Sequence, residues 1–204
     1  MKQCPHCNGL LEVLSISTAG SSICPHCHKI LPLFTKRYFS IFGFVESFFI
    51  EDVRLQEMLY TLQSIYHPDK FAHCLPLERE VALQNSSVIN QAYHVLKNPL
   101  TRAEYLLTSS GVDVQAAKAA PALIAESFGW RMRLEESATH EHLDKLLADM
   151  LNIESDALEN LGKCFTKRLY EDALQVYTRL KFLQRFKQEI KNKSDCLDDD
   201  HNHL

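Results

Sequence analysis

Two Cys-Pro-His-Cys sequences near the start of the chain constrain its fold more than any other feature. They occupy residues 4–7 and 24–27, and sixteen residues separate them. A spacer of two residues lets one tight turn direct both thiolates at a single ion, and two such turns complete a tetrahedron of sulfur around Zn²⁺. The spacing therefore predicts one zinc ion, bound by four thiolate ligands: Cys4, Cys7, Cys24 and Cys27.

This metal site is expected to be structural, because four thiolates leave no open position for a substrate. Residues 1–37 are too few to form a sizeable hydrophobic core, and a metal ion would take its place. Tetrahedral sulfur suits iron as well as zinc, so the spacing leaves the metal's identity open. Three histidines, His6, His26 and His28, could substitute as ligands. Three further cysteines have no partner at ligand spacing and are expected to be inert thiols: Cys74, Cys164 and Cys196.

The composition of the chain favours a helical, globular protein. Its 204 residues are 46% hydrophobic and 24% charged, and they include only six glycines and seven prolines, too few for the turns of an all-β fold. Apolar runs are only a few residues long, and the first residues match neither a secretory signal nor an import sequence. We therefore expect no membrane association and a cytoplasmic location in a bacterium, or the mitochondrial matrix if the source is eukaryotic.

Hydrophobic periodicity predicts a mostly α fold after the cysteine-rich segment. Two amphipathic runs flank the sequence His67-Pro68-Asp69, and a short helix follows that ends near Gly111. From Pro121 onward, three amphipathic runs with short links, the last two separated at Gly162, predict an antiparallel bundle. The expected organisation is a metal-binding domain at 1–37, a helical domain at 38–112, a three-helix bundle at 118–193 and a disordered acidic tail at 194–204.

The His67-Pro68-Asp69 turn carries the most specific functional signal, although a plain connector between helices also uses proline and aspartate. In its helical context the segment resembles a J-domain, the module that stimulates ATP hydrolysis by DnaK-type chaperones. More narrowly, the chain resembles the HscB family of iron–sulfur-assembly co-chaperones, called Jac-type in mitochondria. The resemblance rests on five stretches: Tyr38-Phe-Ser-Ile-Phe-Gly43, Tyr66-His-Pro-Asp-Lys-Phe71, Ile89-Asn-Gln-Ala-Tyr93, Leu96-Lys-Asn-Pro-Leu100 and Arg102-Ala-Glu-Tyr-Leu-Leu107. Residues 1–37 resemble the four-cysteine piece of the family's animal members.

The resemblance implies a protein with two binding faces that is not itself an enzyme. His67, Pro68, Asp69 and Lys70 would engage the ATPase partner, which is HscA in bacteria. The bundle would bind IscU, the scaffold protein on which clusters are built. The residues implied on the scaffold face are Ile124, Ala125, Phe128, Arg131 and Phe182.

These apolar residues could instead belong to the core of the bundle, where large apolar residues on helices are usually found. The first bundle helix carries a second row that could fill the core in their place. This second row consists of Leu123, Ser127, Trp130 and Leu134. We therefore expect one row to be buried and the other to be exposed as a partner-binding patch.

One feature departs from the usual J-domain, in which the helix before His-Pro-Asp shows a basic face. Here residues 51–66 carry three acids against Arg54 alone, so electrostatic steering toward a chaperone is expected to be weak. Two other functions remain as alternatives, a general J-domain co-chaperone and a zinc-ribbon nucleic-acid-binding protein. Residues 1–37 carry a net charge of only +3, which does not favour nucleic-acid binding. The sequence leaves open a homodimer through residues 1–37 and contact with the cluster itself.

Overall fold

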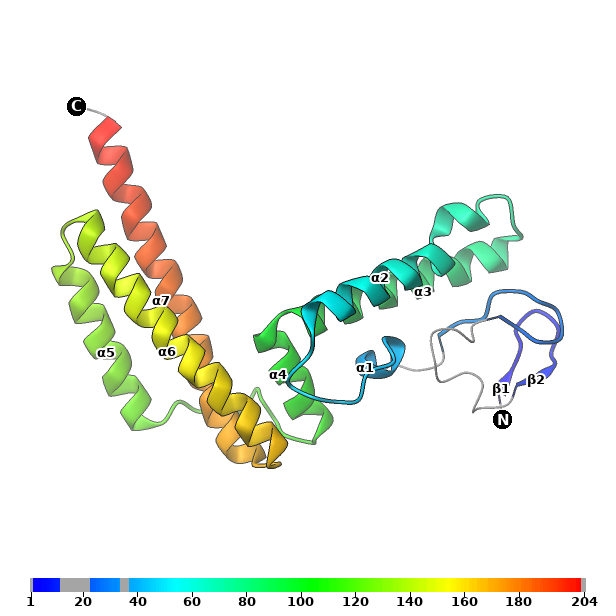
Figure 1. Ribbon diagram of the computed structural model, residues 1–204, viewed down its shortest axis with the longest axis horizontal. Helices are drawn as coiled ribbons and strands as arrows, with labels where there is room; N and C mark the ends of the chain where they lie inside the picture. The colour runs from blue at the N-terminus through cyan, green and yellow to red at the C-terminus, as the bar shows by residue number, and fades with distance from the viewer. Residues whose placement is uncertain (1, 12–22, 34–36, 203–204) are drawn as a thin grey trace. The chain divides into compact units, whose positions relative to one another are not determined.

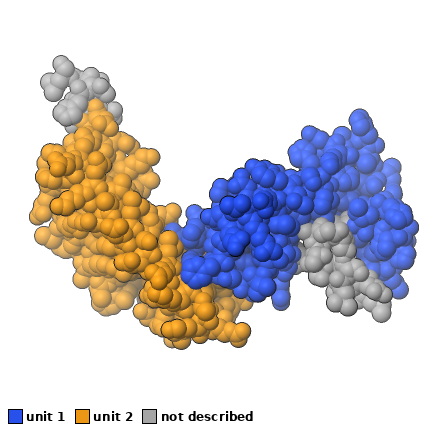
Figure 2. Space-filling model, viewed as in Figure 1, with its two compact units in different colours: residues 1–102 blue, residues 103–204 orange. Residues whose placement is uncertain are grey.

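The computed structural model describes residues 2–11, 23–33 and 37–202. The chain divides into two compact units, residues 1–102 and 103–204 (Figure 2). The first unit holds the four-cysteine segment together with the helices that flank the His67 turn, and the boundary falls within a helix rather than near residue 112. The described residues confirm the mostly α fold, since helices predominate and the two strands are two residues long each.

The four-cysteine segment has little regular structure and a very small core. Strand β1 (Lys2–Gln3) pairs antiparallel with β2 (Leu10–Leu11), and an isolated bridge joins Ile23 to Ile30 in the second half. Each pairing closes one cysteine turn at its base. The buried cluster consists of Cys4, Leu11, Cys24 and Leu31, with Cys27 packed against it.

The rest of the first unit is a helical arm around the His67 turn. It comprises α1 (Tyr38–Ile41), α2 (Asp52–Tyr66), the 3₁₀ helix η3 (Pro68–Phe71) and α3 (Pro76–Lys97). Helices α2 and α3 pack side by side (Figure 1). Helix α2 ends at His67, whose extended backbone (ψ 128°) is the conformation that a following proline favours. The buried faces of the two long helices are Leu55, Leu59, Leu62 and Tyr66 on α2, and Val81, Ala82, Asn85, Ile89, Ala92 and Leu96 on α3.

A buried arginine ties the base of this arm. Arg102 is 5% exposed, in helix α4 (Pro99–Ser109), and it donates to the carbonyls of Leu96 and Phe48 at 2.6 Å each. Burial lowers the pKa of Arg102, and nearby Asp52 opposes that shift. The guanidinium thus satisfies the Leu96 carbonyl at the end of α3, which has no partner within the helix, and links it to the backbone of Phe48.

The second unit contains the expected three-helix bundle. Its helices are α5 (Pro121–Glu136), α6 (His140–Thr166) and α7 (Tyr170–Asn202), which lie together in Figure 1. In the core, the rings of Trp130 and Phe186 lie 5.7 Å apart. None of the described helices combines the length and the hydropathy that a membrane-spanning segment requires.

The expected break at Gly162 is wrong. Gly162 is buried inside α6, and the helix ends instead at Thr166, followed by Arg168 with φ 58°. A glycine inside a helix costs only about 1 kcal/mol relative to alanine, and packing of the flanking residues in the bundle overrides that cost.

The acidic tail also differs from the expected disorder, because α7 continues through Asn202; residues 203 and 204 lie outside the described part of the chain. Lys193 donates to the carbonyl of Leu134 at 2.6 Å, and the His140 ring contacts Ser194 at 3.2 Å and Asp198 at 3.1 Å. These contacts to the end of α5 and the start of α6 hold the last turns of α7 in place, which the sequence pattern of the tail does not reveal.

Candidate functional site

The two cysteine turns have the same backbone geometry. In the first, the N–H of Asn8 donates to the carbonyl of Cys4 at 2.9 Å, and in the second His28 donates to Cys24 at the same distance. Asn8 and His28 both have φ 56°, a left-handed conformation at the same position of each turn. The repeated Cys-Pro-His-Cys sequence therefore folds into two equivalent turns that face each other.

The four sulfur atoms form a compact cluster. The Sγ atoms of Cys4 and Cys27 lie 3.7 Å apart, those of Cys7 and Cys24 lie 3.8 Å apart, and all four are within 4.8 Å of one another. Tetrahedral Zn²⁺ with bonds of about 2.3 Å separates its sulfur ligands by about 3.8 Å. The donor set and its spacing therefore fit one tetrahedral ion, as the sequence predicts.

The surroundings of the cluster favour the ionised thiolate of Cys24 and oppose ionisation of Cys27. Burial raises the pKa of Cys24, but hydrogen bonds from the backbone N–H groups of Cys27 and His26 outweigh it and lower the pKa to about 6. At Cys27 a backbone hydrogen bond from Lys29 lowers the pKa, whereas burial and the neighbouring thiols raise it to about 12. A divalent cation would remove this conflict, because metal ligation requires thiolates.

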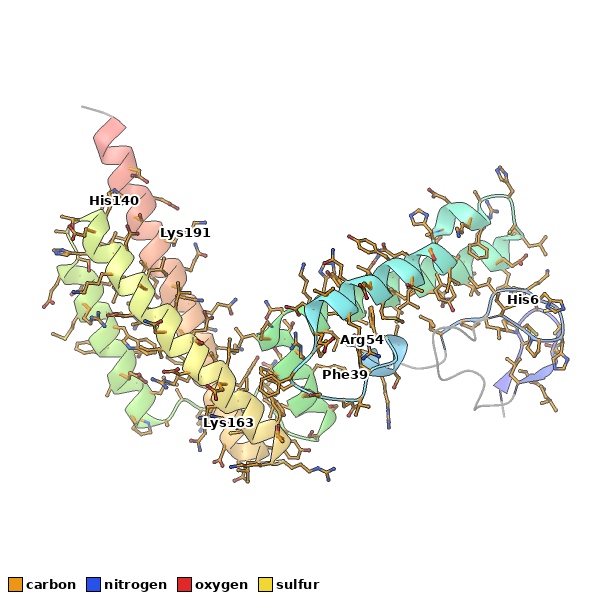
Figure 3. The ribbon with its side chains drawn as sticks, in the orientation of Figure 1. His6, Phe39, Arg54, His140, Lys163 and Lys191 are labelled. Atoms are coloured by element: carbon orange, nitrogen blue, oxygen red, sulfur yellow. The ribbon has the colours of Figure 1, made fainter. Side chains whose placement is uncertain are left out.

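Two of the candidate histidine ligands connect the turns instead. The Nε2 atom of His6 donates to the carbonyl of Ile30 at 2.9 Å, and Nε2 of His26 donates to that of Leu10 at 3.1 Å (His6 is labelled in Figure 3). Each ring thus reaches from one turn to the backbone of the other. The ring of His26 lies so close to Gly9 that a Cβ atom there would be 2.6 Å from it. Within the described residues, the cluster that could hold an ion consists of the four cysteines alone.

The His67 turn is an exposed loop at the end of α2. The Nδ1 atom of His67 accepts a hydrogen bond from the backbone N–H of Asp69 at 3.4 Å and lies 3.5 Å from the Asp69 carboxylate. The Lys70 ammonium donates to the carbonyl of Ser64, so it caps the end of α2. The four residues expected to bind a chaperone therefore lie together, with the Asp69 carboxylate largely in solvent.

Apart from Leu134, which is half-buried, the two rows of α5 have the burial predicted from the sequence. Ile124 is 54% exposed and Phe128 is 65% exposed, while Leu123 and Trp130 are buried. Ala125 and Arg131 are exposed as well, and Phe182 on α7 is half-buried. Met132, next to Arg131 on the implied scaffold face, is 49% exposed and extends the apolar row. The helical spacing of Ile124, Phe128 and Met132 was the signal that could have placed it there.

Ion pairs with α7 hold the exposed face of α5 in place. Arg179 on α7 contacts the Glu126 carboxylate with two nitrogens, at 3.1 and 2.5 Å. Arg131 lies 3.6 Å from Glu189, also on α7. These bonds hold α7 against α5 beside the exposed row, so the apolar patch is presented by two fixed helices.

Comparison with known proteins identifies the family. A family model described as the HSCB C-terminal oligomerisation domain matches residues 119–191. A co-chaperone HscB homologue from Neisseria meningitidis is 33% identical over 162 residues, which cover 76% of this chain and 98% of the relative. The chain belongs to the HscB co-chaperone family. A similar homologue from an Azoarcus species is 30% identical and covers 79% of this chain and 95% of the relative.

Solved HscB structures share the fold. HscB from Vibrio cholerae is 29% identical, with a TM-score of 0.71 over 78% of this chain and 98% of that protein. Human HscB is 23% identical, with a TM-score of 0.87 over 94% of this chain and 98% of that protein. The mostly α architecture derived from the sequence is therefore the HscB architecture.

Proposed function

We propose that this HscB-family chain acts in iron–sulfur cluster assembly by binding the cluster scaffold and delivering it to a DnaK/HscA-type chaperone, whose ATPase it stimulates. The exposed apolar row on α5, next to a buried row that fills the core, is the observation that carries the proposal. Ile124, Phe128 and Met132 are exposed at successive turns of one helix face, and a contiguous exposed apolar patch of this kind marks a partner surface. The family's co-chaperone identity supports the same conclusion.

The His67 turn is the proposed chaperone-binding element. Pro68 restricts the turn, His67 organises it through the Asp69 backbone, and the exposed Asp69 carboxylate is available to a partner. Its role is a polar contact that favours the hydrolysis-competent state of the chaperone, since a ligand shifts an equilibrium through its differential affinity for the two states. Lys70, bound to α2, supports the turn.

The α5 row is the proposed scaffold-binding element. Phe128 offers a large exposed ring that can act as an anchor, and Ile124 and Met132 flank it along the helix. Arg131 and the half-buried Phe182 border this patch as polar and aromatic contacts. We propose an apolar surface on the scaffold as the partner, because the row itself offers little charge.

The ion proposed for the four cysteines is zinc, in a structural role. The sulfur spacing supports one tetrahedral ion, and the ligand set suits zinc or iron. Elemental analysis of protein purified without chelator separates them, since we expect one zinc per chain. One iron per chain in place of zinc would contradict this assignment.

Self-association is proposed to use the bundle rather than residues 1–37. The matched family model is described as an oligomerisation domain and covers only the bundle. Sedimentation of the full chain before and after treatment with a chelator tests this. An oligomer that dissociates when the metal is removed would instead assign the contact to the four-cysteine segment.

The proposed function is tested by measuring ATP hydrolysis by the chaperone with the chain and with the chain plus scaffold. We expect stimulation by the chain, a further increase with the scaffold, and neither with Asp69→Asn. Asp69→Asn should leave the thermal midpoint almost unchanged, because the turn buries little surface. Stimulation by any unfolded client to the same extent as by the scaffold would favour a general J-domain co-chaperone.

A further inference from the structure

Asn85 is a buried amide on the face of α3 that otherwise carries apolar residues. It is 2% exposed, and its neighbours one turn away, Ala82 and Ile89, are fully buried. Its Nδ2 donates to the carbonyl of Leu31 at 2.9 Å, and its Oδ1 accepts from the N–H of Leu33 at 2.9 Å. The side chain therefore offers one segment a donor and an acceptor together, as a neighbouring strand would.

The segment that Asn85 binds leads out of the second cysteine turn. We name residues 29–33 the exit segment. A second contact between this segment and α3 is the ion pair of Lys29 with Glu78, at 3.7 Å. Glu78 and Asn85 are seven residues apart, which places them on the same face of the helix two turns from each other. Helix α3 thus holds the exit segment at two points.

The cysteine turns hold the exit segment from its other side. The N–H of Cys24 donates to the carbonyl of Lys29 at 2.8 Å, and the ring of His6 donates to that of Ile30 at 2.9 Å. Two consecutive carbonyls are therefore bound by the metal-binding turns, and the next one, on Leu31, is bound by Asn85. Disorder in the turns would reach Asn85 directly, because the carbonyls of Ile30 and Leu31 belong to adjacent residues.

Asn85 couples the stability of helix α3 to the attachment of the exit segment. If the exit segment detached, the buried amide would lose both of its partners, and an unsatisfied buried amide opposes the folded state. A metal ion that binds only the ordered turns also stabilises any segment whose order depends on those turns. Here that segment is the exit segment, together with its contacts to Asn85. The order of the cysteine turns, the attachment of the exit segment to α3 and the two hydrogen bonds of Asn85 therefore stabilise one another.

We propose that metal binding at the four cysteines stabilises helix α3, and that Asn85 is the positioning residue that transmits this effect. The inference rests on the proposed metal binding. Because α3 packs against α2 on the other side of the His67 turn, metal occupancy then raises the free energy of local opening of the proposed chaperone-binding arm, whose helices remain formed in both states.

Hydrogen exchange of the full-length chain, measured by mass spectrometry with zinc bound and after removal of zinc by a chelator, tests the proposal. We expect amides of residues 76–97 to exchange about tenfold or more slowly with zinc bound. In Asn85→Ala, zinc should still bind with one ion per chain, but the exchange of α3 should no longer depend on it. If Asn85 had only a structural role, Asn85→Ala would accelerate the exchange of α3 equally with zinc bound and with zinc removed.

Asn90→Ala is the matched control. Asn90 is also on α3, but its side chain accepts from Gln63 of α2 at 3.1 Å. This variant should loosen the arm and retain the full zinc dependence. Glu78→Gln removes only the half-buried ion pair with Lys29, so it should lose part of the zinc dependence. It provides a second variant if Asn85→Ala does not fold.

Three results would overturn the inference: α3 exchange in the unaltered chain that is independent of bound zinc, unchanged zinc dependence in folded Asn85→Ala, or unchanged zinc dependence in Glu78→Gln when Asn85→Ala does not fold. A chain that binds no metal by elemental analysis would instead refute the proposed metal site, so the two failures are distinguishable.

Discussion

The four-cysteine segment and the C-terminal bundle reach a folded state by different means. The segment buries a cluster of four residues, and two of these are the proposed ligands Cys4 and Cys24. The bundle buries rows of apolar side chains along three helices, including Met150 and Leu161 with no exposed area. One region therefore has too few apolar residues for a core and relies on the proposed ion, while the other has enough apolar residues to fill a core and leave a row exposed.

Loss of one cysteine should be the most disruptive single change. It should disorder the four-cysteine segment and leave the C-terminal bundle intact. In Cys24→Ser we expect loss of bound zinc and of ordered NMR signals from residues 2–11 and 23–33, because structural zinc contributes on the order of 10 kcal/mol to such domains. The far-UV circular dichroism should be almost unchanged, since the helices lie elsewhere. Cys196→Ser, at an exposed thiol, is the control, and retention of one zinc by Cys24→Ser would contradict the assignment.

The exposed row of the bundle predicts the next largest effect. Phe128→Ala combined with Phe182→Ala should weaken scaffold binding roughly a thousandfold by titration calorimetry, at about 2 kcal/mol per aromatic anchor. The variant should stay folded, because Trp130 and its row still fill the core. Leu151→Ala, an exposed leucine on α6, should bind normally. A collapsed helical signal, or normal affinity in a folded variant, would remove the proposed face.

A change inside the bundle core should destabilise that unit without affecting the metal. Met150→Ala removes a completely buried side chain from α6, at a cost of about 2–5 kcal/mol. Thermal unfolding should shift to lower temperature, while zinc content stays at one per chain. Loss of zinc in a sample that remains folded would show that the two regions depend on each other more than their separate cores suggest.

The smallest expected effect comes from the histidine that connects the two cysteine turns. His26→Phe keeps a ring beside Gly9 and removes the bond to the Leu10 carbonyl, so zinc should transfer to a chelator about 10–100-fold faster. His73→Phe, in an exposed loop, is the matched control. Unchanged release from His26→Phe would mean that the turns need no connection beyond the ion.

Sequence reasoning was most successful where one chemical rule acts over a few residues. The spacing of Cys4 and Cys7, and of the second pair, placed four sulfur atoms together. Proline at Pro68 marked the end of α2. The two rows of α5 had the burial that their spacing indicated, because helical periodicity separates the faces of a helix. Whether the His67 turn binds a chaperone and the exposed row of α5 binds a scaffold stays a prediction.

Sequence reasoning failed where distant residues compete with a local preference. Gly162 looks like a helix end, yet packing keeps it inside α6. The acidic tail has few apolar residues, yet contacts of His140 with Ser194 and Asp198 accompany a longer α7.

By itself the sequence determined which four cysteines come together, the helical class, the turn at His67 and the two faces of α5. Only the tertiary structure decided what the polar residues within buried faces do. Asn85 binds a segment more than fifty residues earlier in the chain, and Arg102 binds the carbonyl of Phe48, also more than fifty residues away. Periodicity and spacing describe interactions between near neighbours, whereas the partners of a buried polar group depend on which distant backbone the fold brings beside it.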